Sequence, residues 1–571
     1  MAQDPPFKVV IVGASVAGLS LANMLQANDI DFVILEAYPN IAPQVGASIG
    51  LLPHGNRILD QLGLYEKILQ VAEPVNTFSF RAPSGLPLAS YPGMDRNLID
   101  RHGYPMMFLD RQTLIQTLYD NIRDKSKILA NKRVTTVNLG KNGVTVLASD
   151  TSTFQGDILI GADGIHSTVR GEMRRLANMT HPGWFDAGEE EGEYLPCEYN
   201  CIFGISRPCQ GIVPGGLHEV FRNGSSYLIS GGQNGRVYWF RFEKLPQRLH
   251  GTQIPRYTQK DLEEALDRAS NDPILPGLNF SELIENRITA VLTPLPEYVY
   301  KKWHFDRIFT LGDSAHKMHP IGGHGGNAAI ETAAALTNSL VDGLSKTSSP
   351  LTTTDIAALF NQVQTLRYPR AMTIKAYSRK KQLTESLDNS LQRFVAFHLL
   401  PRVREQDVTR SYSAQIPGSE KLDMLPLPYR MKLVPYKDEL VAKPKGRGMA
   451  RFMILGIYLT CSAFAFYLRW LSPSATELGN QINKVLVEGS FEDDSLTLLQ
   501  RARTGILLIG DRVAFMAAAL VPGLSNPTKQ LGRIQLYSLS QSLHPTIILT
   551  LEGFRGHFAV SVLTWYVLIR L

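Results

Sequence analysis

The chain of 571 residues contains little cysteine and little charge. Its four cysteines are too few for a disulfide framework, and the cluster CEYNCIFGISRPC (197–209) lacks a nearby fourth ligand for a zinc site. Charged residues make up 19% of the chain, the formal net charge is only +6, and charges of both signs are mixed along the sequence. We therefore expect reduced, half-buried thiols and no nucleic-acid partner.

A signal-peptide pattern is also missing, because MAQDPPFKVVIVG runs directly into an apolar, β-branched stretch. One long uncharged run does occur, from Phe452 to Leu468, after the basic residues of 443–451. Its length is just sufficient to cross a bilayer, and the preceding basic residues favour a cytosolic position for what comes before it. We predict a soluble body with a membrane-associated tail; a buried soluble helix is the alternative.

The stretch FKVVIVGASVAGLSLANMLQANDIDFVILEA carries the strongest local signal. Residues 7–12 form an apolar run typical of a buried parallel strand, Leu19–Gln26 predicts a helix, and residues 31–36 predict a second strand. A strand, a tight turn, a helix and a second strand in this order predict a βαβ unit that binds a dinucleotide.

Four residues of this unit are candidates for the dinucleotide site. Gly13, Ser15 and Gly18 occupy the three positions of the glycine-rich turn, with serine in place of the middle glycine. The helix that follows directs free N–H groups and its positive dipole end toward a pyrophosphate. Glu36 ends the second strand, where an acid binds a ribose diol and disfavours a 2′-phosphate. NAD and FAD both remain possible on this pattern alone.

The stretch GDSAHKMHPIGGHGGN (312–327) permits two interpretations. His316, His319 and His324 with Asp313 could ligate a metal. However, Pro320 and the glycines interrupt any helix between the second and third histidines. The glycines alternatively form a turn that feeds the alanine-rich helix after residue 327, where backbone N–H groups can face a ligand.

Three further elements help to choose between NAD and FAD. They are a DR pair at 110–111 that opens a helix, a DG pair at 163–164 and a GD pair at 312–313. The DG and GD pairs each follow an apolar strand. With the fingerprint, this order resembles the group A flavin-dependent monooxygenases, the para-hydroxybenzoate hydroxylase-like family, over residues 7–380. Residues 42–68 and the apolar tail are most similar to fungal membrane-associated epoxidases of meroterpenoid and indole-diterpene pathways.

The resemblance implies FAD as the cofactor, NADPH as a transient reductant and no metal. By the family's motifs, Asp313 would bind the ribityl chain, Glu36 the adenosine ribose, and Arg111 the phosphates or ribityl oxygens. The glycine loop would lie against the isoalloxazine ring, with His324 in place of the expected glutamine. The implied cofactor-binding residues are Gly13, Ser15, Gly18, Glu36, Gly50, Arg111, Asp163, Asp313, Gly325, Gly326 and Asn327.

The resemblance also implies an α/β fold. It consists of a Rossmann-like FAD-binding domain, a β-sheet substrate domain and a C-terminal helical, membrane-associated region. We place the FAD-binding domain at residues 1–180 and 301–345, the substrate sheet at 181–300, the helical region and linker at 346–440, and the membrane-associated tail at 441–571.

Between the DG and GD elements, aromatic and polar residues alternate around turn signals at Asn223-Gly224 and Asn234-Gly235. This pattern predicts an antiparallel sheet of hairpins. In the family such a sheet lines the substrate pocket, so Tyr227 and Arg207 are our candidates for catalytic residues that orient the substrate. An aromatic sheet core is the alternative for Tyr227.

The expected activity follows from the same resemblance: an FAD-dependent monooxygenase that uses NAD(P)H and O2 to epoxidise an alkene of a prenylated intermediate. A separate terpene cyclase would open the product. We expect attachment to the endoplasmic reticulum membrane, with the catalytic domain in the cytosol. An aromatic hydroxylase, a reductase of isoprenoid double bonds and a non-catalytic FAD-fold protein that shields lipids are the alternatives.

Overall fold

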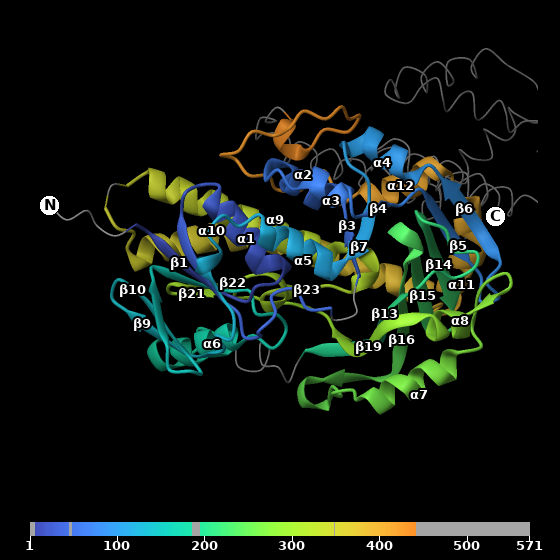
Figure 1. The fold of residues 1–571 in the computed structure, drawn as a ribbon, viewed down its shortest axis with the longest axis horizontal. Helices are drawn as coiled ribbons and strands as arrows, with labels where there is room; N and C mark the ends of the chain where they lie inside the picture. The colour runs from blue at the N-terminus through green and yellow to red at the C-terminus, as the bar shows by residue number, and fades with distance from the viewer. Residues whose placement is uncertain (1–5, 45–47, 186–194, 348, 441–571) are drawn as a thin grey trace, which may run out of the picture. The chain divides into compact units, whose positions relative to one another are not determined.

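The predicted βαβ unit is present at the centre of a parallel sheet. In the computed structural model, β1 (Lys8–Val12) pairs in parallel with β2 (Asp31–Leu35) on one side and with β12 (Ile158–Gly161) on the other. The helix α1 (Val16–Gln26) connects β1 to β2. The structure describes residues 6–44, 48–185, 195–347 and 349–440 (Figure 1). The predicted tail at 441–571 lies outside the described residues.

The full sheet has six strands in the order β21-β22-β12-β1-β2-β8. All its pairings are parallel except that of the edge strand β21, which is antiparallel to β22. This arrangement confirms the predicted Rossmann-like α/β core. The remaining strands of this sheet are β8 (Ile128–Leu129), β21 (His304–Phe305) and β22 (Ile308–Thr310).

Both faces of this sheet are covered, because alternate residues of β1 pack in opposite directions. Val9 and Ile11 pack in the same core as α1, α5 (Arg111–Asp120) and α9 (His324–Ser345). Val10 and Val12 pack in another core, with α6 (Thr168–Thr180) and the small sheet β11-β10-β9. Figure 1 shows these helices and strands on opposite sides of the parallel sheet. The small sheet comprises β9 (Val134–Gly140), β10 (Gly143–Ala148) and β11 (Thr153–Gly156).

A second, seven-stranded sheet contains the predicted hairpins. Its order is β19-β13-β16-β15-β14-β5-β6, and β14-β15 and β15-β16 pair antiparallel. Two strands, β5 and β6, come from residues 77–92, so a boundary at residue 181 passes through this sheet. The strands are β5 (Thr77–Arg81), β6 (Pro87–Pro92), β13 (Pro196–Ser206), β14 (Gly216–Arg222), β15 (Ser225–Gly231), β16 (Val237–His250) and β19 (Arg287–Pro296).

The helical region after the GD element packs on α9. The helix α10 (Thr353–Glu385) is followed by α11 (Ser390–Phe394) and α12 (Glu405–Ser413), which lie within the helical region predicted at 346–440. Within residues 6–440, no helix that the structure describes combines the length and apolarity needed to span a membrane. Residues 1–440 form one compact unit.

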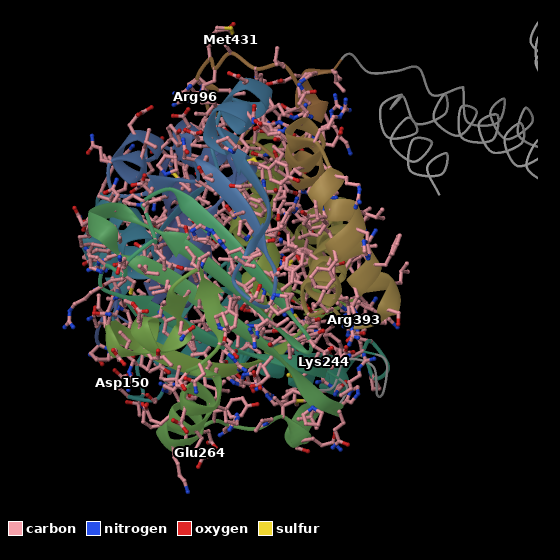
Figure 2. The ribbon with its side chains drawn as sticks, turned by 90° about the vertical axis from the view of Figure 1, so that its right-hand side faces the viewer. Arg96, Asp150, Lys244, Glu264, Arg393 and Met431 are labelled. Atoms are coloured by element: carbon pink, nitrogen blue, oxygen red, sulfur yellow. The ribbon has the colours of Figure 1, made fainter. Side chains whose placement is uncertain are left out.

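Shorter elements connect these parts. They are β3 (Ser48–Leu51), α2 (Pro53–Gln61), α3 (Tyr65–Leu69), β4 (Glu73–Pro74), α4 (Met94–His102), β7 (Met107–Asp110), α7 (Gln259–Ala269), β17 (Pro273–Leu275), β18 (Leu278–Asn279), α8 (Phe280–Glu285), β20 (Tyr298–Val299) and β23 (His316–Lys317). Charged side chains such as Arg96, Asp150 and Glu264 lie at the periphery (Figure 2).

Cys197, Cys201 and Cys209 are free, as the composition predicts, but they are buried rather than half-buried. Burial raises the pKa of the Cys197 and Cys209 thiols to about 11, so both stay protonated at neutral pH. The fourth, Cys461, lies outside the described residues.

Gly204 of β13 tests the packing of the seven-stranded sheet. A Cβ atom at Gly204 would lie 2.0 Å from Cζ2 of Trp239, which is fully buried. Overpacking of this kind costs about 1–3 kcal/mol, so we expect Gly204→Ala to lower the unfolding temperature. Gly171 of α6 is exposed with open space around it, so Gly171→Ala should gain up to about 1 kcal/mol from helix propensity. Thermal unfolding of both variants measures the difference; equal stability of Gly204→Ala and wild type would contradict this packing.

Candidate functional site

A cavity of about 980 Å³ extends from the glycine-rich turn after β1 to the seven-stranded sheet. Its position beyond the carboxyl ends of parallel strands is where open α/β sheets bind ligands. The structure brings most of the predicted cofactor residues to its wall: Gly13, Ser15, Glu36, Gly50, Arg111, Asp163, Asp313, Gly325 and Gly326. Gly18 and Asn327 do not line the cavity. Their contacts indicate structural roles, in close packing for Gly18 and in backbone hydrogen bonding for Asn327.

The glycines of the first turn are required by close packing. Gly13 has φ +104°, and a Cβ atom there would lie 2.5 Å from the carbonyl oxygen of Ala162. A Cβ atom on Gly18 would lie 2.0 Å from the carbonyl oxygen of Gly13. The missing side chain of Gly18 therefore allows the turn to pack closely against α1. The missing side chain of Gly13 allows the turn to pack closely against the residue that follows β12. Ser15 is the N-cap residue of α1, and its side chain makes no capping hydrogen bond to the helix. The N–H groups of the first turn therefore stay available to an anion, although serine replaces the middle glycine.

Glu36 and Arg111 set the charge of this end of the cavity. Glu36 accepts hydrogen bonds from the backbone N–H groups of Ala14 (2.7 Å) and Tyr38 (3.0 Å), which fix its carboxylate beside the turn. Arg111 donates from Nη2 to the Ser15 hydroxyl at 2.6 Å. Burial lowers the pKa of Arg111, and the carboxylates of Asp313 and Glu36 oppose that effect. A guanidinium beside a helix N-terminus suits a pyrophosphate.

The DG and GD turns meet at one side of the same cavity. Asp163 accepts hydrogen bonds from the Ser167 hydroxyl (2.5 Å) and the Val169 backbone N–H (3.0 Å), which tie the DG turn to α6. Burial raises the pKa of Asp163, although these hydrogen bonds oppose the shift. Asp313 pairs with Lys317 at 3.2 Å and keeps a partly exposed carboxylate at the cavity wall.

The glycine loop leaves room for a flat group, and its last residues form the first turn of α9, which begins at His324 rather than after residue 327 as predicted. Gly323 has φ +67°, and a Cβ atom at Gly323 or Gly325 would meet open space. Asn327 accepts from the backbone N–H of Leu52 (3.0 Å) and donates to the carbonyl oxygens of Gly50 (2.9 Å) and Gly323 (2.7 Å). Asn327 therefore joins the loop to β3 from outside the cavity.

These residues fit FAD in every part that the resemblance implies. The N-terminus of α1 with Arg111 suits the pyrophosphate, Glu36 suits the ribose, and the open space over Gly323 and Gly325 suits the isoalloxazine ring. The N-terminus of α9 directs its dipole toward this space, which stabilises negative charge on a bound ring.

The histidines of the GD loop are structural in these surroundings. His316 Nε2 lies 3.1 Å from the Thr332 hydroxyl, His319 Nδ1 accepts from the Ile321 backbone N–H at 3.4 Å, and His324 stacks on His54. Burial lowers the pKa of His316 and His324 to about 4 and that of His319 to about 3, so all three are neutral at pH 7. Among the residues the structure describes, no three His, Cys, Asp or Glu side chains are grouped to hold a metal ion.

The other end of the cavity is one cross-strand row of the seven-stranded sheet. Phe203 pairs with Phe240, Phe240 with Leu228, and Leu228 with Glu219, so four neighbouring strands each contribute one side chain. All four side chains line the cavity, and the rings of Phe203 and Phe240 meet edge to face at 5.3 Å. Three of the four are apolar, and Glu219 is the exception.

Sequence reasoning missed Glu219. The stretch LHEVF contains a signal, because Leu217, Glu219 and Phe221 share one face of β14 and two of the three are apolar. A lone acid on the core-facing side of a strand indicates a buried partner or a binding role.

The substrate-orienting role predicted for Tyr227 and Arg207 has no support in their positions. Tyr227 follows the strand alternation and lies on the face opposite to Leu228, where its hydroxyl donates to Asp272 at 2.5 Å and accepts from Arg241. Arg207 is exposed beyond the end of β13. Neither lines the large cavity. Tyr227 matches the alternative interpretation, an aromatic sheet core.

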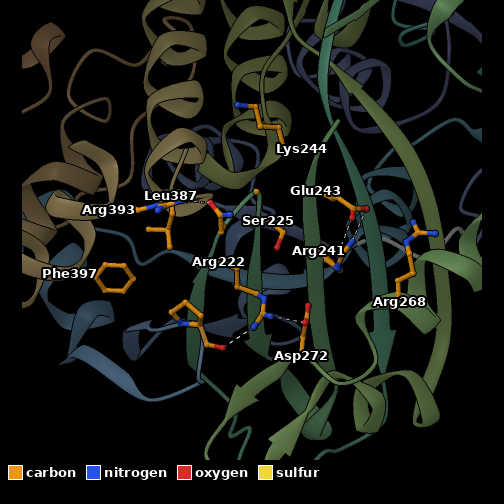
Figure 3. A pocket seen from close by; sticks show the side chains of 13 residues that line it. Arg222, Ser225, Arg241, Glu243, Lys244, Arg268, Asp272, Leu387, Arg393 and Phe397 are labelled. Carbon is orange, nitrogen blue, oxygen red and sulfur yellow. Dashed lines mark hydrogen bonds and ion pairs between the residues drawn. The ribbon is translucent and has the colours of Figure 1, made fainter. Parts of the chain in front are cut away.

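The polar contacts of Tyr227 belong to a second cavity of about 640 Å³, which shares no lining residue with the first. Figure 3 shows its charged side chains, in which Arg222 pairs with Asp272 at 2.8 Å and Arg241 with Glu243 at 3.0 Å. Lys244 pairs with Asp388. These mutual pairs neutralise much of the positive charge of this cavity.

A leucine at position 325 tests the assignment of the flat space. We expect Gly325→Leu to fold, because the position is helical and open, but to weaken FAD binding roughly 10- to 100-fold by steric overlap. The dissociation constant from FAD fluorescence quenching, with thermal unfolding of the apoprotein, measures both effects. Gly171→Leu is the matched control, a helical glycine with open space that lies outside the cavity. Unchanged FAD affinity in Gly325→Leu would place the ring elsewhere.

Comparisons with known proteins identify the family of this chain. The model of the FAD binding domain family matches residues 6–354. FAD-dependent monooxygenase spyC of Aspergillus fumigatus is 40% identical over 433 residues, which cover 75% of this chain and 90% of that protein. FAD-dependent monooxygenase andE of Emericella variicolor is 37% identical over 470 residues, which cover 81% and 95%.

The crystal structure of Klebsiella pneumoniae HpxO complexed with FAD and uric acid has a TM-score of 0.58 at 22% identity, over 72% of this chain and 96% of that chain. At this identity the likeness shows the shared fold. The family match and the fungal relatives confirm the class of enzyme that the motifs predicted, and the chain belongs to the FAD-dependent monooxygenases that carry this FAD binding domain.

Proposed function

We propose that this monooxygenase epoxidises an alkene of a prenylated biosynthetic intermediate, of the meroterpenoid or indole-diterpene type, and so primes it for cyclisation. The observation that carries the proposal is the apolar row of Phe203, Phe240 and Leu228 in the cavity that also contains the nucleotide turn. An isoprenoid chain has no polar group of its own, so only apolar surface of this kind can hold it.

The residues of the cavity divide the work. FAD, when bound and reduced by NAD(P)H, supplies activation of O2 for transfer of one oxygen atom. The net reaction converts alkene, O2, NAD(P)H and a proton to epoxide, NAD(P)+ and water. Arg111, Glu36 and Asp313 hold the cofactor at one end. Phe203 and Phe240 exclude water from the alkene and hold it in place, which this chemistry requires.

Oxygen labelling separates this reaction from ring hydroxylation. We expect membranes containing the full chain, with FAD, NADPH and ¹⁸O2, to place one labelled oxygen atom on the prenyl chain of a farnesylated phenol or a geranylgeranylated indole. Mass spectrometry of product fragments locates the label. Label on the aromatic ring would replace the epoxidase with an aromatic hydroxylase. Running NADH in parallel tests the choice of reductant.

The proposal also includes attachment to the endoplasmic reticulum membrane, with the catalytic unit in the cytosol. A terpene cyclase would then take up the epoxide. Support comes from the segment that precedes residue 441. Tyr429, Met431 and Leu433 are 92%, 81% and 79% exposed, more than any other large hydrophobic residue the structure describes. They alternate with Arg430 and Lys432, which pair with acids of the folded unit. Figure 2 shows Met431 at the periphery.

A tryptophan at position 431 tests this contact. We expect Met431→Trp to show fluorescence quenching by brominated lipids in vesicles, because an exposed apolar side chain next to a bilayer enters its interface. Met179→Trp is the matched control, an exposed methionine of α6 in a different part of the fold. The increase over wild-type quenching measures the contact, and equal quenching of the two variants would remove this support.

A further inference from the structure

Ionisable side chains from three elements meet where the cross-strand row ends. Glu219 of β14 and Tyr412 of α12 line the cavity, and Lys381 and Glu385 of α10 contact them. The side chains of Glu219, Glu385 and Lys381 are only 1%, 2% and 10% exposed. Burial of such groups is expensive unless charges and hydrogen bonds are matched.

The Lys381 ammonium lies between the two acids of this cluster. Its Nζ pairs with Glu219 at 2.5 Å and with Glu385 at 2.6 Å. Burial and the adjacent Glu219 carboxylate raise the pKa of Glu385 well above its usual range, which favours its neutral form.

The hydrogen bonds within the cluster leave acceptor positions free. Lys381 Nζ donates to Glu219 Oε1 at 2.5 Å and to the Tyr412 hydroxyl at 2.6 Å. It also forms an ion pair with Glu385 Oε1 at 2.6 Å. Tyr412 donates its own proton to Glu219 at 3.2 Å. The Glu219 carboxylate and the Tyr412 oxygen keep lone pairs, so the cluster offers acceptors to the cavity.

The cross-strand row extends well beyond this cluster. Phe203 lies on β13, and Glu219 lies three strands farther along the row, on β14. Neighbouring strands are 4.7–4.9 Å apart, so the row spans about 14 Å. One aromatic ring does not cover this length, whereas a ring with an extended isoprenoid chain does.

We propose that Glu219 and Tyr412 form an acceptor subsite for the ring of the substrate, which binds a free O–H or N–H group while the prenyl chain runs along Leu228, Phe240 and Phe203. The inference rests on the proposed function and names its substrate class: prenylated phenols, enols or indoles whose ring donor is free. A carboxylate on the ring is repelled by Glu219, and an O-methyl ether leaves the acceptors without a donor. Buried polar groups left unpaired in this way disfavour the wrong ligand strongly.

A matched pair of substrates tests the subsite: a farnesylated phenol and its O-methyl ether, which differ only at the ring donor. Binding to the FAD-loaded full chain is followed by the change in flavin absorbance, which needs no turnover, and turnover by ¹⁸O-labelled product. We expect wild type to bind the phenol at least about 10-fold more tightly than the ether. The same ratio should appear for an indole against its N-methyl derivative.

Glu219→Gln replaces an acceptor-only group with an amide of the same shape that also donates. Its ratio of phenol to ether affinity should fall to within about threefold. Lys381 keeps its ion pair with Glu385 in this variant, so the fold is retained. Tyr412→Phe removes one acceptor and should lower the ratio by less. Glu263→Gln, on the surface of α7, is the control and should keep the wild-type ratio. FAD affinity and unfolding temperature identify any variant that fails to fold.

Equal binding of phenol and ether by wild type would overturn the subsite, as would an unchanged ratio in both Glu219→Gln and Tyr412→Phe. A preference for the phenol that Glu219→Gln abolishes supports the subsite even where no epoxide forms. That result would refute the epoxidation proposal alone, so the two failures are distinguishable.

Discussion

The cavity depends on the side-chain amide of Asn327. This one group bonds to Leu52, Gly50 and Gly323, and so joins strand β3 to a loop almost 280 residues later in the chain. An amide is suited to this task because it both donates and accepts, which an aspartate of the same shape does not. The glycine loop has few side chains with which to pack. Its position against β3, and hence the flat space above Gly325, is therefore fixed by hydrogen bonds.

A buried ionic cluster joins α9, which follows the same loop, to α10 and α2. Glu331 of α9 lies 2.6 Å from Arg370 of α10, contacts Arg367 and lies 3.5 Å from His54 of α2. Burial alone would favour a neutral Glu331, but the two guanidinium groups lower its pKa. Removal of one partner of such a cluster costs about 3–5 kcal/mol because the remaining charge is stranded. The cluster thus fixes the positions of α2, α9 and α10 relative to one another, including the first turn of α9.

The seven-stranded sheet separates two environments by alternation alone. Leu228 and Phe240 face the nucleotide cavity, while their neighbours Tyr227 and Arg241 face the second cavity with its paired charges. Glu219 introduces charge at the end of the row of Phe203, Phe240 and Leu228, and Lys381 balances it from α10. One sheet therefore supplies both an apolar row of side chains and a charged position at the end of that row.

The sequence by itself determined the parallel core and most of the nucleotide end. Glycines, apolar strands and Glu36 act over short distances, so their spacing already specifies a βαβ turn and the chemistry it binds. It also specified the hairpins, since Asn-Gly turns are local. It did not specify which face of a strand points inward, and for that reason Tyr227 was a candidate while Glu219 was missed. Gly18 and Asn327 were recognised as important, but not as packing and clamping residues. Only the tertiary structure decided these points. The orientation of each strand face and the burial of its side chains depend on which elements pack together. The packing of β14 against α10 and α12 involves contacts between residues more than 150 positions apart.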